Sequence, residues 1–197
     1  MEWSRVEMAI QTERTMTVAE YLEWEERQEI KHEYIDGEII EMSGGTGEHS
    51  IIIGNIQGLL WNLLSFPQYT LHTSEMRVKF SPTRYVYPDL SVVRGESIYD
   101  DGSRLNLLNP VFVVEVTSPS SAIRDRLDKL DNYFTVSSIE AYLIVDQDRP
   151  RADLYTRAEE GWHVRIFNRA EDVIPLPMLD CHLPLEQVYR GIEFADA

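Results

Sequence analysis

Two apolar runs separated by a stretch of helical periodicity constrain the fold of this chain more than any other feature. The runs are VFVVEVT at residues 111–117 and AYLIVD at residues 141–146, and each is apolar on both faces of a strand. Such strands lie at the centre of a sheet that is covered on both sides. Between them, residues 121–135 carry an apolar stripe at helical spacing, made of Ile123, Leu127, Leu130 and Phe134. The order predicts a parallel strand-helix-strand unit with a right-handed crossover.

One charged residue, Glu115, interrupts the first apolar run. An ionised carboxylate left unpaired in an apolar interior costs several kcal/mol even after the surroundings relax. A glutamate at this position of a central strand therefore needs a hydrogen-bond donor, a cation or a metal ion close to it.

The residues before this unit predict a helix, a hairpin, a second helix and further strands. Residues 17–31 begin with a Thr17–Glu20 capping box, and the dipeptide Asp36-Gly37 is typical of a tight hairpin turn. Residues 48–64 have one apolar helical face. Strands are expected near 70–80 and over 84–93, and Pro88 marks a point where strand pairing breaks, because proline has no N–H to donate.

The C-terminal part of the chain predicts a β-meander over RADLYTR and HVRIF, followed by a proline-rich surface segment that ends in one helical turn. Together these elements predict an α/β or α+β fold with a mixed central sheet flanked by helices, an N-terminal helix and hairpin, and a C-terminal β-meander. We expect residues 1–16 to be an N-terminal extension and residues 17–197 to form one domain.

Composition limits the environment and the partners of this chain. It has one cysteine, Cys181, and its first residues lack an apolar core segment, so we expect a soluble protein of the reducing cytoplasm. The net charge of −16 argues against broad binding to nucleic acid. About half of this charge lies in residues 1–41, which hold twelve acidic and four basic residues. The rest of the chain is acidic but mixed.

Two carboxylates on neighbouring predicted strands are the main candidates for chemistry. Asp89 follows Pro88, where pairing should break, and Glu115 lies toward the end of the next strand. Hard divalent cations such as Mg²⁺ prefer oxygen ligands and are often held by one or two carboxylates. The pair therefore suits a catalytic metal. The structural alternative is an aspartate in a Pro-Asp turn and a glutamate paired with an arginine.

These residues also resemble a known signature. "PD" at 88–89 and "EVT" at 115–117 resemble the PD-(D/E)XK restriction-endonuclease-like superfamily, except that Thr117 stands where the signature has lysine. A closer resemblance is to the Uma-two family of restriction endonucleases, whose lysine usually lies on the following helix. The matching pieces span residues 17–157 and are HEYIDGEII, the histidine of GEHS, YPDLSVV, VVEVTSPSS, RDRLDKLDNY and EAYLIVD.

The resemblance implies a restriction-endonuclease-like core and a DNA-cleaving enzyme that uses Mg²⁺ or Mn²⁺. Carried over by position, Asp89 and Glu115 would be metal ligands, Lys129 would be the displaced lysine, and Glu33 and His49 would be accessory site residues. Nucleases of this fold often act as dimers, so a homodimer is also implied.

Each accessory residue has an alternative structural role. Glu33 would be a solvated glutamate, His49 a helix-end histidine bonded to a loop, and Lys129 the helical ion-pair partner of Asp125. For the whole chain, the alternative to an endonuclease is a non-catalytic member of the same fold that binds a partner. The net charge favours this alternative, whereas the complete set of carboxylates and lysine favours the enzyme.

Two aromatic residues have predicted structural roles, and one class of enzyme is disfavoured. Trp61 and Tyr133 are predicted to pack in the core or on its flank rather than to stack on bases. A serine or cysteine hydrolase is disfavoured, because Cys181 lies in the proline-rich tail and no serine occupies a nucleophile elbow.

Overall fold

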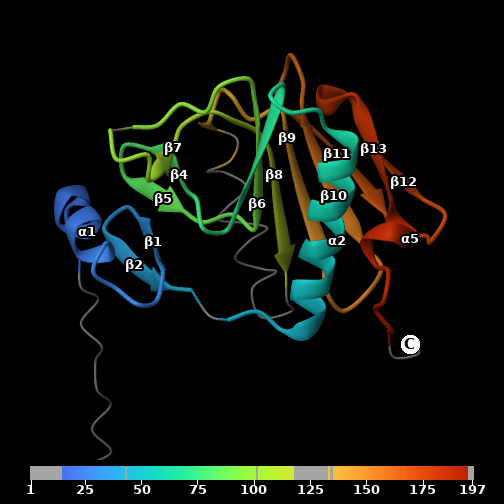
Figure 1. Cartoon of the computed structure of the whole chain (residues 1–197), viewed down its shortest axis with the longest axis horizontal. Coiled ribbons are helices and arrows are strands. Elements are labelled where there is room, and N and C mark those ends of the chain that lie inside the picture. The colour runs from blue at the N-terminus through green and yellow to red at the C-terminus, as the bar shows by residue number, and fades with distance from the viewer. Residues whose placement is uncertain (1–14, 43, 101, 118–132, 134, 195–197) are drawn as a thin grey trace, which may run out of the picture.

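The computed structural model describes residues 15–42, 44–100, 102–117, 133 and 135–194, and its largest element is a six-stranded sheet (Figure 1). β8 and β9 are parallel, and the other neighbouring pairs of this sheet are antiparallel. The predicted parallel pairing of the two apolar strands is confirmed, whereas most of the predicted helix 121–135 lies outside the described residues. In order across the sheet the strands are β11 (Trp162–Phe167), β10 (Ala152–Arg157), β9 (Ala141–Asp146), β8 (Pro110–Thr117), β6 (Leu90–Arg94) and β3 (Tyr69–Thr73).

A second sheet of five strands carries the N-terminal elements. The hairpin predicted around Asp36-Gly37 is confirmed, and both turn residues have positive φ, at 52° and 105°, as this turn type requires. Beside it lies α1 (Val18–Glu25), which begins with the predicted capping box between Thr17 and Glu20. The strands, in order, are β2 (Glu38–Glu41), β1 (His32–Ile35), β5 (Arg84–Val86), β4 (Arg77–Ser81) and β7 (Asn106–Leu107).

The first helix is shorter than the predicted span of residues 17–31, because the chain leaves helical geometry after Glu25. The backbone N–H groups of Arg27 and Gln28 bond to carbonyls three residues earlier rather than four. The Glu25 carboxylate then accepts the backbone N–H of His32 at 2.8 Å, which ties the helix end to the start of β1.

The mixed α/β class is confirmed, but the strands form two mixed sheets rather than the single central sheet that we predicted. The run predicted as one strand over 84–93 is divided at Pro88, with β5 in the five-stranded sheet and β6 in the six-stranded sheet. Proline cannot donate to a ladder, so neither sheet continues through this residue. The chain crosses from one sheet to the other at Tyr87-Pro88-Asp89.

The prediction of a proline-rich surface segment near the C-terminus is wrong. Residues 173–188 form a β-hairpin of β12 (Val173–Leu176) and β13 (Cys181–Pro184), joined by a short 3₁₀ turn and followed by the helical turn α5 (Leu185–Val188). The inward-facing residues of this segment are fully buried in the main core and include Ile174, Leu176, Leu183, Leu185 and Val188. Prolines are tolerated here because the hairpin has only two strands, each with an open edge.

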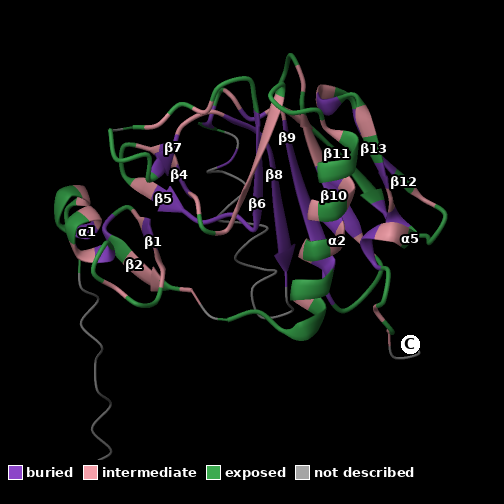
Figure 2. Ribbon diagram, in the orientation of Figure 1, coloured by how far each residue is buried: buried purple, intermediate pink, exposed green. Residues whose placement is uncertain are grey.

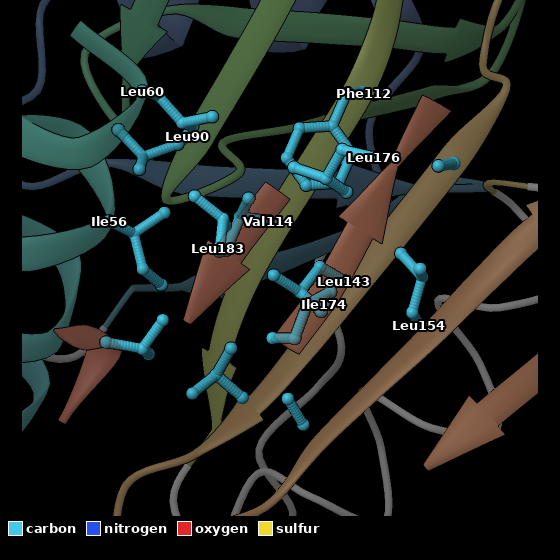
Figure 3. Close-up of a cluster of buried hydrophobic side chains, with 14 of the residues drawn as sticks. Ile56, Leu60, Leu90, Phe112, Val114, Leu143, Leu154, Ile174, Leu176 and Leu183 are labelled. Carbon is cyan, nitrogen blue, oxygen red and sulfur yellow. The ribbon is translucent and has the colours of Figure 1, made fainter. Parts of the chain in front are cut away.

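The main hydrophobic core lies between the six-stranded sheet, the C-terminal hairpin and α2 (Gly47–Leu63) (Figure 3). α2 matches the predicted helix 48–64 and contributes Ile52, Ile56 and Leu60, each fully buried. The opposite face of the sheet packs in a second cluster that includes residues of the five-stranded sheet. All eight residues of β8 are therefore buried (Figure 2), as a strand that is apolar on both faces requires.

The outer side of α2 departs from one expectation. Trp61, which we predicted to pack in the core or on its flank, is 72% exposed.

Among the described helices, none combines the length and the apolar character that crossing a membrane would demand.

Candidate functional site

The crossing between the two sheets places Asp89 beside the C-terminal end of β8. Tyr87, Pro88 and Asp89 are all buried. Asp89 Oδ2 accepts the backbone N–H of Val116 at 2.7 Å. If the β6–β8 register continued, Val116 would face Pro88, which offers no regular pairing there. The Asp89 carboxylate thus takes the place of a strand partner for β8, and this bond fixes its position.

The strand register relates Asp89 to Glu115. Leu90 pairs with Val114 and Ser91 with Val113, so the register extended by one residue sets Asp89 across from Glu115. Directly opposed residues on antiparallel strands have Cβ atoms about 4.5 to 5.5 Å apart. Both residues are also largely buried, with 8% and 6% of their surface exposed. The extended register therefore sets Asp89, directly before β6, opposite Glu115 on the adjacent strand β8.

The hydroxyl of Tyr133 supplies a hydrogen-bond donor to Glu115. It donates to Glu115 Oε1 at 2.5 Å, and both side chains are buried. The Tyr133 ring stacks on Tyr142 with centroids 4.1 Å apart and meets Phe80 edge-on at 4.4 Å, so its hydroxyl is held in place. Burial, with the Glu115 charge second, raises the pKa of Tyr133 well above its usual value. Tyr133 thus stays a donor throughout the physiological pH range.

His49 lies at the start of α2 and reaches Asp89. Its backbone N–H donates to Thr46 Oγ1, which caps the helix, and its ring Nε2 lies 3.4 Å from Asp89 Oδ2. The amino-terminal end of a helix also carries a partial positive charge, which favours a nearby anion. The structure therefore brings His49 to one of the predicted metal ligands, and since Asp89 lies in the segment between β5 and β6, the alternative of a helix-end histidine bonded to a loop stays open.

Glu33 is buried on β1, with 5% of its surface exposed, and is not the solvated glutamate of the alternative reading. Its Oε1 accepts the backbone N–H of Tyr87 at 3.4 Å, two residues before Asp89. Its charge is also a minor cause of the raised pKa of Tyr133, after burial and the nearer Glu115. Glu33 thus lies at the same crossing, on the side of the five-stranded sheet.

A second buried glutamate supports this side of the crossing. Glu25 accepts the Tyr87 hydroxyl at 3.1 Å and lies 3.1 Å from His32 Nδ1. Tyr87 is therefore held at its backbone by Glu33 and at its hydroxyl by Glu25. These bonds fix the backbone directly before Pro88 and Asp89.

The position of the signature lysine is occupied by Thr117, which lies two residues after Glu115 and so on the same face of β8. The Thr117 hydroxyl donates to Asp146 Oδ1 at 3.3 Å, and Arg149 Nε donates to Asp146 Oδ2 at 2.7 Å. Asp146 ends β9 and pairs with Thr117 in the parallel register. Asp146 is therefore a further buried carboxylate beside the Glu115 face, with an arginine bound to it.

Lys129 lies outside the described residues, so its predicted place in the site stays a prediction. Among the residues that the structure does describe, no group of three or more histidine, cysteine, aspartate or glutamate side chains has the arrangement of a metal site. The candidate centre consists of the two carboxylates, with His49 and Glu33 as neighbours.

Sequence reasoning missed the roles of Tyr133 and Asp146. Tyr133 packs in the core as predicted, but its hydrogen bond to Glu115 was not expected, although its place one helical turn after Lys129 puts both residues on one predicted face. Asp146 was read only as the end of a buried strand. The signal for it was present, because β8 and β9 were predicted to be parallel and the carboxyl ends of such strands share one edge of the sheet.

Comparison with known proteins adds a family and a fold. The family Uma2, described as "Putative restriction endonuclease", matches residues 18–186. Two uncharacterized proteins of Synechocystis sp. are each 34% identical to the chain, over 89% and 76% of its length and over 92% and 85% of their own. A crystal structure described as a putative nuclease belonging to DUF820, from Anabaena variabilis, matches with a TM-score of 0.74 at 20% identity and covers 88% of this chain and 97% of that one.

Proposed function

The chain belongs to the Uma2 family, described as "Putative restriction endonuclease", and on this premise we propose that it is a metal-dependent endonuclease that hydrolyses phosphodiester bonds of DNA. One observation carries the proposal. Asp89, directly before β6, and Glu115, on β8, are both largely buried, and the β6–β8 register extended by one residue sets them opposite each other where the chain crosses between the sheets. Two buried carboxylates repel each other unless a proton or a cation lies between them.

The donor set at this point fits a hard divalent cation. Carboxylate oxygens are the ligands that Mg²⁺ and Mn²⁺ prefer, and one or two of them are often enough when waters complete the shell. We assign Asp89 and Glu115 as the ligands. When bound, the cation would lower the pKa of a water molecule and offset negative charge at the scissile phosphate.

The chain's own residues hold these carboxylates in place. The Val116 N–H donates to Asp89 Oδ2, and the Tyr133 hydroxyl donates to Glu115 Oε1. His49, whose Nε2 lies 3.4 Å from Asp89 Oδ2, would bind a water molecule or accept a proton. Glu33 positions the backbone of Tyr87 and therefore the approach to Asp89.

We further propose that Lys129 supplies the cationic group that Thr117 cannot. Helical periodicity predicts that Lys129 lies one turn before Tyr133 on the same flank, and the Tyr133 hydroxyl contacts Glu115. A lysine stem can fold along apolar surface and present its ammonium at a neighbouring strand end. There the ammonium would orient the attacking water or offset phosphate charge.

The second candidate function is a non-catalytic member of this fold that binds a partner. The net charge of −16 favours it, because an acidic surface weakens binding to DNA phosphates. The two candidates differ in a measurable way, since only the enzyme requires metal-dependent cleavage that is lost with Glu115.

The test is nicking of supercoiled plasmid DNA in Mg²⁺ or Mn²⁺, with a chelator as the blank. We expect cleavage that weakens as salt is raised, because salt screens the few phosphate contacts of an acidic protein. Glu115→Ala should abolish cleavage, whereas Glu75→Ala, which removes an exposed glutamate from another part of the chain, should leave it unchanged. Cleavage that survives Glu115→Ala, or that is equal in the chelator, would point to a contaminating nuclease or to the non-catalytic candidate.

Lys129 has its own test in the same assay. Lys129→Ala should lower cleavage on the order of a hundredfold while Mn²⁺ affinity and folding stay nearly unchanged. Asp125→Ala is the matched control, because it removes only the partner of the alternative helical ion pair, which would contribute about 0.3 to 0.5 kcal/mol. Equal rates of cleavage by both variants and by the unaltered chain would show that Lys129 is a surface residue without a role in cleavage.

A further inference from the structure

The outward face of α2 is apolar, free of charge and exposed. We use "outward face" for four residues of this helix: Ile51, Gly54, Gly58 and Trp61. Ile51 is 44% and Trp61 72% exposed, and Figure 2 shows exposed residues along the outer side of α2. A tryptophan this exposed on an apolar helix face is typical of an interaction surface rather than of a free one.

Charge makes this region distinct from the rest of the molecule. Residues 49–74 contain no aspartate, glutamate, lysine or arginine, although these types make up 26% of the chain and give it a net charge of −16. Two copies of so acidic a protein repel each other wherever acidic surfaces meet. The outward face of α2 is a place where two copies can approach without opposing like charges.

Gly54 and Gly58 are not explained by contacts within one copy of the chain. Glycine is a poor residue for a helix interior because it loses the most backbone freedom on folding. A Cβ atom added at either position would meet no heavy atom within 4 Å, so no neighbour in the fold requires the missing side chain. Paired small residues four apart on a helix permit the close approach of a second helix.

The outward face is also symmetric about its own centre. Gly54 and Gly58 lie at equal distances on either side of residue 56, and so do Ile51 and Trp61. On a helical wheel of 100° per residue, Ile51 and Trp61 lie on opposite flanks of the stripe, as do the two glycines. A two-fold axis through this centre would bring Trp61 of one copy level with Ile51 of the other along the paired helices, and Gly54 level with Gly58. Isologous dimers require such self-complementarity.

We propose that the outward face of α2 is the contact surface of a homodimer in which two α2 helices pair antiparallel about a two-fold axis near residue 56. The glycines form the close crossing point. The Ile51–Trp61 contacts lie about 7.5 Å from it along each helix, given a rise of 1.5 Å per residue. This inference does not depend on the proposed nuclease activity.

Sedimentation velocity of the full chain over a range of concentrations tests the proposal. The unaltered chain should sediment as a species of twice 22.9 kDa at high concentration and dissociate on dilution. Ile51→Lys alone and Trp61→Glu alone should each weaken association by at least about tenfold, because each buries an unpaired charge twice in the dimer. An unaltered chain that is monomeric at every concentration overturns the proposal.

Mixing the two single variants is the sharpest form of this test. In a mixed dimer one Ile51–Trp61 contact is kept and the other becomes a Lys–Glu pair, so the mixture should associate more tightly than either variant alone. Val164→Glu, at a 52% exposed position on β11, is the control and should not change association. Far-ultraviolet circular dichroism of each variant checks folding. A mixture no tighter than its components, or dissociation by the control, contradicts the antiparallel helix pairing.

Two alanine substitutions distinguish the effect of the glycines on helix stability from their effect on dimerisation. Gly54→Ala and Gly58→Ala together should raise the thermal stability of the monomer, because alanine favours the helix. The same pair should weaken the dimer, because two methyl groups enter the crossing point from each copy. A double variant that dimerises as tightly as the unaltered chain would show that the helices do not cross at these glycines.

Discussion

At the scale of single residues, Glu115 shows how a buried charge constrains its surroundings. A carboxylate within an apolar strand needs a donor or a cation, and the structure provides a fixed donor in Tyr133. The same requirement applies to Asp89, which takes the Val116 N–H. Both acids are thus held in place before any ligand arrives. This is the arrangement that a preorganised metal site needs.

The first prediction concerns the hydrogen bond between Tyr133 and Glu115. Tyr133→Phe removes a buried hydrogen bond to a carboxylate and should lower the free energy of unfolding by about 1.5 to 3 kcal/mol. The measurement is urea unfolding of Tyr133→Phe, Glu115→Gln and the double variant, with the coupling energy taken from the cycle. A coupling energy below about 0.5 kcal/mol would mean that this bond does not hold Glu115.

At the scale of elements, periodicity and turn chemistry predicted what local sequence determines. The capping box at Thr17, the Asp36-Gly37 hairpin, α2, and the parallel pair β8 and β9 are all found. What failed was the assignment of strands to sheets. Pro88 was recognised as a break, but a break does not say that the chain then joins a different sheet, because that depends on which long-range pairing buries more apolar surface.

The prediction for the C-terminal hairpin failed for a related reason. Its prolines indicated a surface segment, whereas the alternation of buried Ile174 and Leu176 with half-exposed Pro175 and exposed Val173 shows a strand covering the core. Such short alternation is a weak signal when two prolines interrupt it. In the candidate site likewise, the residues that lie far apart in the sequence, Glu33 and His49 among them, came from the family resemblance and not from periodicity.

The hairpin gives a prediction with a control on the next residue. Ile174→Ala removes a fully buried side chain from the main core and should lower the free energy of unfolding by about 2 to 5 kcal/mol. Val173→Ala, at a 46% exposed position of the same strand, should change it by less than about 0.5 kcal/mol. Urea unfolding compares the two variants. Equal, small effects would show that the hairpin does not belong to the core.

At the scale of the whole molecule, buried tyrosines make stability depend on alkaline pH. Burial is the largest cause of the raised pKa values of Tyr21, Tyr87 and Tyr189, and it raises the pKa of Tyr87 to about 12 from an ordinary value of 10.0. Above pH 10 the unfolded chain releases these protons while the folded chain keeps them. The unfolded state then binds fewer protons, so stability falls as pH rises.

The alkaline prediction is therefore a loss of stability that begins near pH 10 and not below it. Each such tyrosine can contribute up to about 1.4 kcal/mol per pH unit within its window, which for Tyr87 extends from about pH 10 to 12. Urea unfolding between pH 8 and about pH 11 measures the slope, and Tyr87→Phe should reduce it. A free energy of unfolding that does not change over this range would contradict the burial of these hydroxyls.

The central claim is that Asp89 and Glu115 together hold a divalent cation where the chain crosses between its two sheets. The most direct measurement is anomalous diffraction from a crystal soaked in Mn²⁺, with a Glu115→Gln crystal soaked in the same way as the control. We predict one strong anomalous peak within about 2.0 to 2.4 Å of a carboxylate oxygen from each residue, absent or much weaker in the Glu115→Gln crystal. A soaked crystal with no peak between these two carboxylates, or with its peak elsewhere and unaffected by Glu115→Gln, would contradict the claim.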